Sequence, residues 1–561
     1  MKKLVIDPVT RIEGHLRAEV EIDDNGIVQE AYVSGQLFRG IEIILQNRDP
    51  RDAGLLAGRI CGVCTNSHFR ASIQAVENAY NIVVPKNAQI IRDLMSMALF
   101  IQDHVVHFYQ LHLLDFVDVT KALIANAQET TIEAHKYCDK PFRNSTSHYE
   151  STLEKLKNFV DAGRLGPFNS NFFGHSEYKL SAEQNLILLS HYFEALTFQT
   201  KISKAIAIFG GKTPHPQSIV VGGVTSVMDM LNPQRLNDFL FEIKEANDFI
   251  NRAYIPDMKL LASAYKDEIK SKSGKTLGNY LCVGGYEINE SMKLFSSGVI
   301  YDGNFLDIKE FDSSKITEEV QRAWYSDDEK QEPFYTDINE DGTLRTAKND
   351  DKYSWIKAPR YGNKTMETGP IARILISYSK NDTAINSFVD NFLKDSSLSL
   401  EDLNCTVGRN ICRAIESQYV CEYIFKLMSN LIQNIKYDDT NTYTNYNFAD
   451  MKKDSKGSNF LEVPRGVLLH SLNIENEKIK NYQVIAPTTW NATPKNIDGL
   501  RGAYEEALVG IKISDTSKPI EVLKVLHSFD PCLACAVHII DTNGKELGVY
   551  KVDPIGGTSR A

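Results

Sequence analysis

The sequence is short of the features that mark membrane-embedded and nucleic-acid-binding proteins. No apolar stretch approaches the roughly 18 consecutive residues of a membrane-spanning helix. Lys and Arg number 62 against 73 Asp and Glu, and the resulting net charge of −11 makes nucleic acid an unexpected partner. Residues 1–7 are too short for a secretory signal, so we expect any export or membrane attachment to depend on a partner.

Cysteine is scarce as well, with nine in 561 residues, and five of the nine follow no regular spacing. These five are Cys138, Cys282, Cys405, Cys412 and Cys421. Their positions match neither a disulfide framework nor the cysteine runs that hold iron–sulfur clusters, so we expect buried thiols. A redox protein of this composition would obtain its iron–sulfur clusters from a partner.

The other four cysteines form two Cys-x-x-Cys pairs at opposite ends of the chain. Cys61 and Cys64 form the first pair, and Cys532 and Cys535 form the second, more than 400 residues later. Four thiolates make a soft site that favours nickel, iron or zinc over calcium or magnesium. In structural zinc sites the pairs lie about 15–20 residues apart, and a chain this long buries a large core without a metal staple. The spacing favours a catalytic or redox metal, with structural zinc as the alternative.

Apolar periodicity predicts long helices, and no internal repeat is present. Residues 88–116 carry apolar side chains at helical spacing, and residues 415–435 form a second such stretch. Exposed loops are predicted at residues 326–351 and 437–458, and strands at residues 16–33 and 548–552. We expect a predominantly helical α+β fold, a single large domain with a long-helix core and small peripheral β-sheets.

Both cysteine pairs lie within longer motifs, and further motifs lie between them. The motifs are DPVTRIEGHLR (7–17), FRGIE (38–42), RICGVCTNSH (59–68), DHVVHFY (103–109), GGKTPH (210–215), METGP (366–370), VPRG (463–466), APTTWN (486–491), GAYEEAL (502–508) and DPCLACAVH (530–538). Together they resemble the large, catalytic subunit of nickel–iron hydrogenases, most closely the respiratory, membrane-associated uptake group. The resemblance covers nearly the whole chain, and it implies the fold of that subunit.

The resemblance implies a nickel–iron centre on the four cysteines. Cys61 and Cys532 would bind nickel alone, whereas Cys64 and Cys535 would bridge nickel and iron. Iron in this family carries carbon monoxide and two cyanides. The cyanides need hydrogen-bond donors, which Arg465 and Thr488 would supply; a surface salt bridge is the alternative for Arg465. The surrounding wall would consist of Pro464, Leu468, Ala486 and Pro487.

Heterolytic cleavage of dihydrogen releases a proton that must leave through a base. By resemblance, Cys532 would take this proton first and pass it to Glu13. Read without the resemblance, Glu13 is a strand-end carboxylate paired with an arginine. Asp103 and Asp530 would form a charged canopy with Arg465, although an Asp-Pro pair is also an ordinary turn.

Three histidines receive separate interpretations. His68 would donate a hydrogen bond to the bridging sulfur and tune its basicity, and a core histidine satisfied by backbone is the alternative. His104 and His107 lie one turn apart on an apolar helix, so we expect core or interface histidines rather than metal ligands.

A second metal is implied near the C-terminus. Glu42 and His538 match the ligands of a magnesium or iron ion, helped by the backbone carbonyl of Val484. In the family the finished subunit ends at this histidine, so residues 1–538 would form the hydrogenase domain. Residues 539–561 would be an extension that a maturation endopeptidase removes by cleaving between His538 and Ile539. Residues 555–561 resemble neither the core nor the usual extension.

The implied function is reversible cleavage of H2 into two protons and two electrons. Electrons would pass to an iron–sulfur small subunit in an obligate heterodimer, or a dimer of heterodimers, and on to a membrane cytochrome b and the quinone pool. The small subunit's twin-arginine signal would export both chains to the periplasmic face of the membrane, and nickel-insertion chaperones would be further partners. A hydrogen-sensing regulatory hydrogenase and a metal-free quinone-binding subunit of the same fold are the alternatives; the extension counts against the first and the four cysteines against the second.

Overall fold

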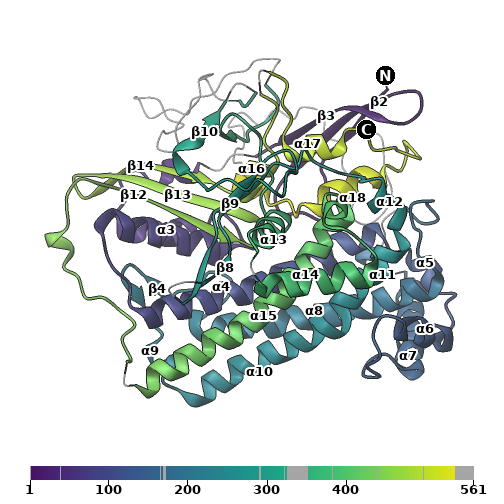
Figure 1. Ribbon diagram of the computed structural model, residues 1–561, viewed down its shortest axis with the longest axis horizontal. Helices are drawn as coiled ribbons and strands as arrows, with labels where there is room; N and C mark the ends of the chain where they lie inside the picture. Colours follow the sequence, from purple (N-terminus) through teal and green to yellow (C-terminus); the bar gives the residue numbers. More distant parts are fainter. Residues whose placement is uncertain are drawn as a thin grey trace.

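Long helices form the centre of the fold (Figure 1). The computed structural model describes residues 2–37, 40–163, 166–168, 172–289, 292–320, 322–324, 352–381, 383–437, 439–496 and 498–536. The central helices are α4 (Lys86–Val106), α8 (Ala182–Gly210), α10 (Pro233–Phe249) and α15 (Thr406–Lys436). Helix α4 packs against α8 and α15, and α10 packs against α15. Their apolar faces form the largest hydrophobic core.

The first predicted helix continues past the end of α4 in a different form. Regular α-helix ends at Val106, a π-helix covers His107–His112, and a 3-10 turn covers Leu113–Asp115. The side chains of His107 and His112 bond to His527 O (2.6 Å) and Asn410 Oδ1 (3.2 Å), which fixes them toward neighbouring segments. A π-bulge of this kind often marks a functional region. Both His104 and His107 are buried, as predicted.

The second predicted helix begins earlier than expected, at Thr406 rather than at residue 415. Its first turns are polar in sequence, so the apolar pattern does not extend to them. These polar side chains are nevertheless buried, because they form ion pairs and backbone contacts inside the protein. Arg409, for example, donates to Glu367 Oε1 at 2.6 Å.

The N-terminal sheet confirms the strands predicted at residues 16–33. It is antiparallel, in the order β1 (Lys2–Ile6), β2 (Leu16–Ile22), β3 (Val28–Gly35). Buried and partly exposed residues alternate along β2, as expected for a strand with one face on the core. The strand predicted at residues 548–552 lies outside the described residues.

A second antiparallel sheet carries part of the candidate site. It consists of β12 (Ser455–Val463), β13 (Gly466–Glu475) and β14 (Lys478–Ile485), and α3 (Thr65–Tyr80) packs on it (Figure 1). Val463 pairs with Gly466, so Pro464 and Arg465 form the tip of a tight hairpin. A Cβ at Gly466 would come within 2.2 Å of Thr368 Oγ1, so this close approach requires glycine.

The predicted loop at residues 437–458 is shorter than expected, because β12 already begins at Ser455. The serine, glycine and asparagine residues in this stretch do not indicate a strand from sequence. The strand is held instead by its pairing with β13. The loop predicted at residues 326–351 lies outside the described residues.

Smaller elements complete a helical α+β domain with small sheets, which is the predicted class. Four strand pairs lie at the periphery: β4 (Ile219–Val220) with β5 (Gly223–Val224), β6 (Tyr280–Cys282) with β9 (Gly298–Ile300), β7 (Gly285–Asn289) with β8 (Met292–Phe295), and β10 (Ile316–Glu319) with β11 (Ala358–Tyr361). The remaining helices are α1 (Ile41–Ile44), α2 (Ala53–Ala57), α5 (Val119–Ala122), α6 (Ala127–His135), α7 (Thr146–Asp161), α9 (Val227–Met230), α11 (Ile255–Ala264), α12 (Lys266–Lys270), α13 (Pro370–Ser379), α14 (Thr383–Ser396), α16 (Pro487–Asn491), α17 (Ala503–Leu508), α18 (Ile520–Ser528) and α19 (Leu533–Ala536). None of the helices in the described part of the chain combines the length and apolar character that a bilayer span requires.

The predicted buried thiols are confirmed with one exception. Cys282, Cys405, Cys412 and Cys421 are buried, whereas Cys138 is only half-buried. Cys138 follows the end of α6 in a surface turn, where less of the core is available to cover it.

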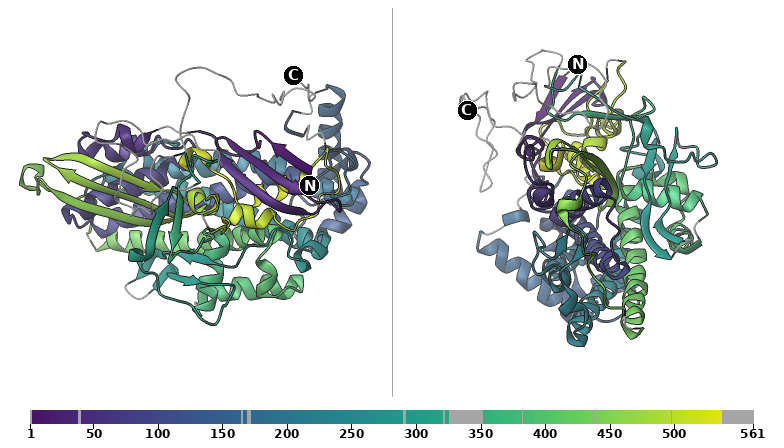
Figure 2. Two further views of the ribbon diagram at one scale, coloured as in Figure 1. Left: turned by 90° about the horizontal axis from the view of Figure 1, so that it is seen from above. Right: turned by 90° about the vertical axis from the view of Figure 1, so that its left-hand side faces the viewer.

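The two ends of the described chain pack together (Figure 2). Strand β3 lies against α17, and Val28 N–H donates to Ile511 O at 3.0 Å. A buried carboxylate, Asp115, joins the ends further: it pairs with Arg11 and contacts His527 Nδ1 at 2.6 Å. The fold thereby brings the segment around Glu13 next to the segment that carries the second cysteine pair.

Replacing Asp115 by asparagine is expected to lower the free energy of unfolding by about 3–5 kcal/mol at pH 7, because Arg11 would keep a charge without its partner. Burial alone would raise the pKa of Asp115, but Arg11 and His527 hold it well below its usual range. A lowered pKa stabilises the fold above the unfolded pKa of about 4, and this stabilisation is lost as the pH falls below that value. Urea unfolding of the wild type and of Asp115→Asn at pH 7 and at pH 3 should show a smaller difference between their free energies of unfolding at pH 3.

The matched control for this prediction is Asp302→Asn, which removes an exposed carboxylate that pairs with Lys364 at 2.9 Å. It should change the unfolding free energy by less than about 1 kcal/mol at either pH. An equal loss in both variants would contradict the role given to Asp115.

Candidate metal centre

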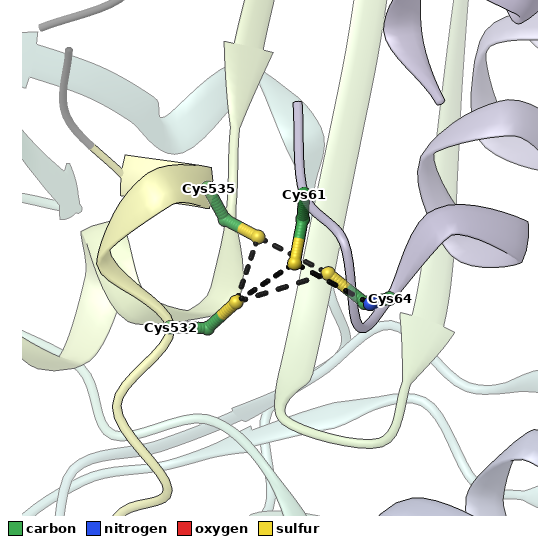
Figure 3. Close-up of side chains that lie close together, drawn as sticks. All are labelled: Cys61, Cys64, Cys532 and Cys535. Atoms are coloured by element: carbon green, nitrogen blue, oxygen red, sulfur yellow. Dashed lines mark hydrogen bonds between the residues drawn. The ribbon is translucent and has the colours of Figure 1, made fainter. Parts of the chain in front are cut away.

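The four paired cysteines converge on one buried point (Figure 3). Cys61 and Cys64 lie in the loop before α3, and Cys532 and Cys535 lie just before and within α19. Their sulfur atoms all lie within 4.8 Å of one another, and the four are free thiols. Cys532 Sγ is 2.9 Å from Cys535 Sγ and 3.4 Å from Cys61 Sγ, and Cys64 Sγ is 3.1 Å from Cys535 Sγ. Within the described residues this is the single group of three or more such side chains that could hold a metal ion.

The geometry and chemistry of this cluster fit a soft transition metal. The N–H groups of Val63 and Cys64 point at Cys61 Sγ, at 3.2 and 3.4 Å, as expected for a sulfur that carries negative charge. Hydrogen bonds from the thiols of Cys532, Cys535 and Cys64 lower the pKa of Cys61 well below its usual range. Burial raises the pKa of Cys532 and of Cys535. Four sulfurs this close therefore need protons or metal cations between them, and nickel and iron suit thiolate donors.

Glu13 joins the N-terminal segment to the second cysteine pair. Its backbone N–H donates to Pro531 O at 3.2 Å, and its carbonyl accepts from Leu533 N at 2.7 Å. The next residue, Gly14, has a φ of +81°, and a Cβ there would lie 2.6 Å from Ala534 N, so only glycine permits this approach.

The Glu13 carboxyl contacts the sulfur of Cys532. Glu13 Oε2 lies 3.2 Å from Cys532 Sγ and accepts a hydrogen bond from Ala534 N at 2.9 Å. Burial and the nearby Cys61 thiolate together raise the pKa of Glu13 to about 7, against the lowering effect of these hydrogen bonds. A carboxyl in this position can accept a proton from the sulfur and release it near neutral pH.

Arg465 lies between two carboxylates beside the sulfurs. It donates from Nη1 to Asp103 Oδ2 at 2.9 Å and from Nη2 to Asp530 Oδ1 at 3.0 Å, and all three side chains are buried. Burial raises the pKa of Asp103 to about 7 despite the charge of Arg465. Among the residues that the structure describes, Arg465 Nε and Asp530 Oδ2 have no partner, so each retains one unused hydrogen-bonding position. The surface salt bridge considered for Arg465 is therefore wrong, because the whole group lies inside the protein.

A small cavity separates Arg465 from the sulfurs. Its wall contains Pro464, Leu468, Pro487, Thr488, His68, Ser67 and Val463, together with Arg465, Cys64, Cys532 and Cys535. Ala486 is buried directly before Pro487. Thr488 Oγ1 accepts a hydrogen bond from Cys532 N at 3.1 Å, so its hydroxyl is held at the cavity wall. The cavity thus combines an apolar lining with a guanidinium and a hydroxyl.

His68 links the cluster to side chains that the sequence did not indicate. His68 Nε2 lies 3.2 Å from Cys535 Sγ, and its Nδ1 lies 3.0 Å from Nε2 of His470. His470 Nδ1 contacts the hydroxyl of Tyr482 at 2.7 Å, and this hydroxyl contacts Ser72 Oγ at 2.6 Å. His470 and Tyr482 are on neighbouring strands, and only the pairing of those strands brings them together. The backbone-satisfied alternative for His68 does not hold, because both of its ring nitrogens face side chains.

Replacing Tyr482 by phenylalanine should lower the free energy of unfolding by about 1–3 kcal/mol, because His470 Nδ1 would be left buried without a partner. Urea unfolding measures this loss. Tyr437→Phe is the control: its side chain is 85% exposed, and its removal should cost less than about 0.5 kcal/mol. Equal stability of the two variants would mean that the hydroxyl of Tyr482 does not support His470.

The residues expected at a second metal are brought together only in part. Glu42 Oε1 accepts a hydrogen bond from Val484 N at 2.7 Å, and Lys357 Nζ lies 3.6 Å from Glu42 Oε2. Val484 therefore faces Glu42 through its N–H rather than through its carbonyl. His538 and Ile539 lie outside the described residues.

His104, which we expect to be a core or interface histidine rather than a metal ligand, contacts Glu416 Oε1 at 2.8 Å.

Comparison with known sequences assigns a family to the chain. The sequence model described as nickel-dependent hydrogenase matches residues 39–538, and a HoxL-like model matches residues 3–34. The quinone-reactive Ni/Fe-hydrogenase large chain of Wolinella succinogenes is 45% identical over 570 aligned residues, which cover 99% of each chain. The uptake hydrogenase large subunit of Rhizobium leguminosarum bv. viciae is 41% identical, covering 98% of this chain and 97% of that one.

Solved structures agree with the sequence comparison. The Ni-Fe-Se hydrogenase from Desulfovibrio vulgaris Hildenborough, in its as-isolated oxidized state, matches with a TM-score of 0.76 and 32% identity, covering 96% of this chain and 100% of that one. The reduced, active Ni-Fe-Se hydrogenase from Desulfomicrobium baculatum matches with a TM-score of 0.74 and 30% identity, with the same coverage. The family also settles the nature of the four-cysteine site, which is that of a nickel–iron centre. The chain belongs to the nickel-dependent hydrogenase family, as a large subunit and an oxidoreductase whose homologues include uptake and quinone-reactive hydrogenases.

Proposed function

We propose that this large subunit oxidises H2 heterolytically, releasing two protons and two electrons. The observation that carries the proposal is the contact between Cys532 Sγ and Glu13 Oε2, at 3.2 Å, beside four buried sulfurs within 4.8 Å of one another. A structural metal site needs the sulfurs alone. A carboxyl poised on one of them, with a pKa of about 7, suits a site that also moves protons.

Each cysteine has a proposed position at the metals. Cys61 and Cys532 would hold nickel, and Cys64 and Cys535 would hold both nickel and iron. When bound, this centre supplies the two-electron redox chemistry that splits dihydrogen. His68 donates from Nε2 to the bridging sulfur of Cys535, which reduces its basicity. Support for this orientation is the chain of contacts through His470 to Tyr482, which can supply the required hydrogens.

Iron in the proposed centre would carry carbon monoxide and two cyanides. Arg465 and Thr488 would donate hydrogen bonds to the cyanides, and Pro464, Leu468, Ala486 and Pro487 would keep water away. Arg465 Nε has no partner among the described residues, which supports this assignment, because a buried guanidinium N–H ordinarily has a partner. Asp103 and Asp530 hold the guanidinium in place through their hydrogen bonds to its Nη1 and Nη2.

Proton release runs through the chain's own side chains. Cys532 Sγ takes the proton from the cleaved molecule and transfers it to Glu13 Oε2. Glu13, whose pKa of about 7 lets it accept a proton and give it up near neutral pH, then releases it toward the surface. Arg465 keeps its charge throughout, because its two carboxylate partners raise its pKa well above the usual range despite burial.

Maturation and the second metal complete the proposal for the chain. Residues 1–538 form the mature domain, and an endopeptidase removes residues 539–561 after nickel-insertion chaperones have acted. Glu42, His538 and Val484 then bind magnesium or iron near the new C-terminus. Support for this grouping is the hydrogen bond from Val484 N–H to Glu42 Oε1, which places these two residues side by side.

The electrons require a partner, since the five remaining cysteines are dispersed single thiols. We infer an iron–sulfur small subunit in an obligate heterodimer, and a membrane cytochrome b that passes electrons to quinone. The name of the Wolinella relative, a quinone-reactive hydrogenase, supports quinone as acceptor. Export with the small subunit would place the pair on the periplasmic face of the membrane.

The test is purification of the chain together with its small subunit, followed by metal analysis and an assay of H2-dependent dye reduction. We expect nickel bound in proportion to the chain, dye reduction that requires H2, and an intact mass that ends at His538. Zinc in place of nickel, with no H2-dependent reduction by processed protein, would overturn the proposal.

A further inference from the structure

Arg373, on α13, is a fully buried arginine whose five N–H groups are all used. Nε and one Nη2 hydrogen donate to the two oxygens of Glu416 at 2.9 and 2.7 Å. Nη1 donates to Glu462 Oε2 at 2.9 Å and to Val463 O at 2.8 Å, and Nη2 also donates to Pro464 O at 2.8 Å. The planar guanidinium therefore fixes five acceptor oxygens, which belong to four residues, at once.

Three of the four residues belong to the hairpin that carries Arg465, and two of them offer backbone carbonyls at its turn. Val463 and Pro464 are the residues directly before Arg465, and the hairpin closes between Val463 and Gly466. Their carbonyls face the same guanidinium, so the turn cannot rotate without breaking two bonds to a charged donor. Hydrogen bonds of this kind are about twice as strong as neutral ones.

Arg373 is also connected to the helix that carries Asp103, the carboxylate partner of Arg465. The connection runs through Glu416. Glu416 also accepts from His104 Nε2, at 2.8 Å, and His104 is the neighbour of Asp103 on α4. Phe100, one turn earlier on α4, lies over the guanidinium, with 5.0 Å between Arg373 Cζ and the ring centroid. One side chain thus connects the turn that holds Arg465 with the helix that holds Asp103.

We propose that Arg373 is a positioning residue, which sets the distance and direction between Arg465 and Asp103 by holding the Val463–Pro464 carbonyls and Glu416. The inference rests on the proposed function, in which Arg465 donates to a cyanide on iron. None of the four cysteines is a hydrogen-bond partner of Arg373. Its effect on the centre must therefore pass through the direction of the Arg465 guanidinium.

A purely stabilising role is the alternative, and a second buried arginine provides the comparison. Arg92 donates to both oxygens of Glu77, at 2.9 and 2.7 Å, and to the carbonyls of Val220 and Gly223, at 2.9 Å each. It is as buried as Arg373 and likewise binds both oxygens of one carboxylate and two backbone carbonyls, but it lacks the second carboxylate that Glu462 provides to Arg373. Its partners include none of the residues around the sulfurs.

The experiment compares Arg373→Lys and Glu416→Gln with Arg92→Lys and Glu77→Gln, each purified as the heterodimer. Infrared spectra record the stretching bands of iron-bound carbon monoxide and cyanide, and nickel content and kcat are measured on the same samples. We expect shifted cyanide bands and a kcat about 10- to 100-fold lower in Arg373→Lys and Glu416→Gln, with nickel retained. The Arg92 and Glu77 variants should keep the wild-type band positions, even if they are less stable.

Unshifted bands in both Arg373→Lys and Glu416→Gln would overturn the inference. Failure of these two variants alone to accumulate as heterodimer would also overturn it, because a positioning role leaves the fold intact. Absence of the bands from the wild-type heterodimer would instead overturn the proposed function, so the two failures are distinguishable.

Discussion

Glu13→Gln is expected to lower the rate of H2 oxidation by about a hundredfold or more, while the nickel content stays at the wild-type level. Glutamine can replace the carboxyl as an acceptor from Ala534 N–H, which lies 2.9 Å from Glu13 Oε2. It cannot take a proton from Cys532 and release it again. The substitution therefore separates metal binding from proton transfer, and H2-dependent dye reduction together with metal analysis measures both.

Two controls sharpen the Glu13 prediction. Glu505 is a buried glutamate whose pKa burial also raises to about 7, and it accepts hydrogen bonds from Val33 N (3.0 Å) and the Tyr353 hydroxyl (2.8 Å). Glu505→Gln should leave the H2 oxidation rate within about twofold of wild type, because Glu505 contacts none of the four sulfurs; a residue of this kind affects stability rather than chemistry. Glu13→Asp should retain part of the activity, because it keeps a carboxyl at a longer distance from Cys532. Full activity in Glu13→Gln would contradict the proposed route.

Cys61→Ala is expected to reduce the nickel bound per chain to less than about a tenth of the wild-type level, and with it nearly all H2 oxidation. Loss of a mere supporting contact at a metal site costs about 10- to 100-fold in affinity, and loss of a ligand costs more. Cys61 Sγ lies 3.4 Å from Cys532 Sγ and accepts two backbone N–H bonds, so its removal opens the buried cluster. Metal analysis of the purified heterodimer measures the effect.

Cys421→Ala is the matched control for the ligand variant. Cys421 is equally buried, but it lies within α15 and outside the cluster. This variant should bind nickel as wild type does and lose only about 1 kcal/mol of stability. Equal nickel content in Cys61→Ala and Cys421→Ala would rule out the four-cysteine site.

Folding and metal binding are coupled in this arrangement, because the two cysteine pairs come from opposite ends of the chain. Neither pair alone offers four donors. The contacts of Glu13 with Pro531, Leu533 and Ala534 close the C-terminal segment onto the N-terminal one. A site built in this way forms only when the ends are docked, so metal affinity should report the completeness of the fold.

The sequence predicts the parts of the site that local motifs define. The Cys-x-x-Cys pairs, Glu13, Arg465 and Asp103 all stand in motifs that resemble a known family, and the fold gathers them around one point. Fold class follows from apolar periodicity, as the long helix at residues 88–116 shows. Such features depend on residues that are close in sequence.

Long-range polar partners could not be predicted in the same way. His470, Tyr482 and Glu416 each contact a side chain hundreds of residues away, and nothing beside them in sequence indicates those neighbours. The sequence does not indicate the early start of α15 for the same reason. Its arginines are typical of a surface helix in sequence, but Arg409 is buried because it pairs with Glu367. Charged residues are mostly exposed in proteins, so a sequence rich in them predicts a surface even where the residues form buried pairs.

The most direct test of the account is an infrared spectrum of the heterodimer purified from its native host. Carbon monoxide and cyanide bound to a metal absorb where protein groups do not, so the spectrum reports the proposed iron ligands without depending on activity. The account predicts these bands in protein that ends at His538, together with their loss in Cys61→Ala. Processed protein that carries metal on its four cysteines but shows no such bands would contradict the nickel–iron assignment and return the site to zinc or to simple electron transfer.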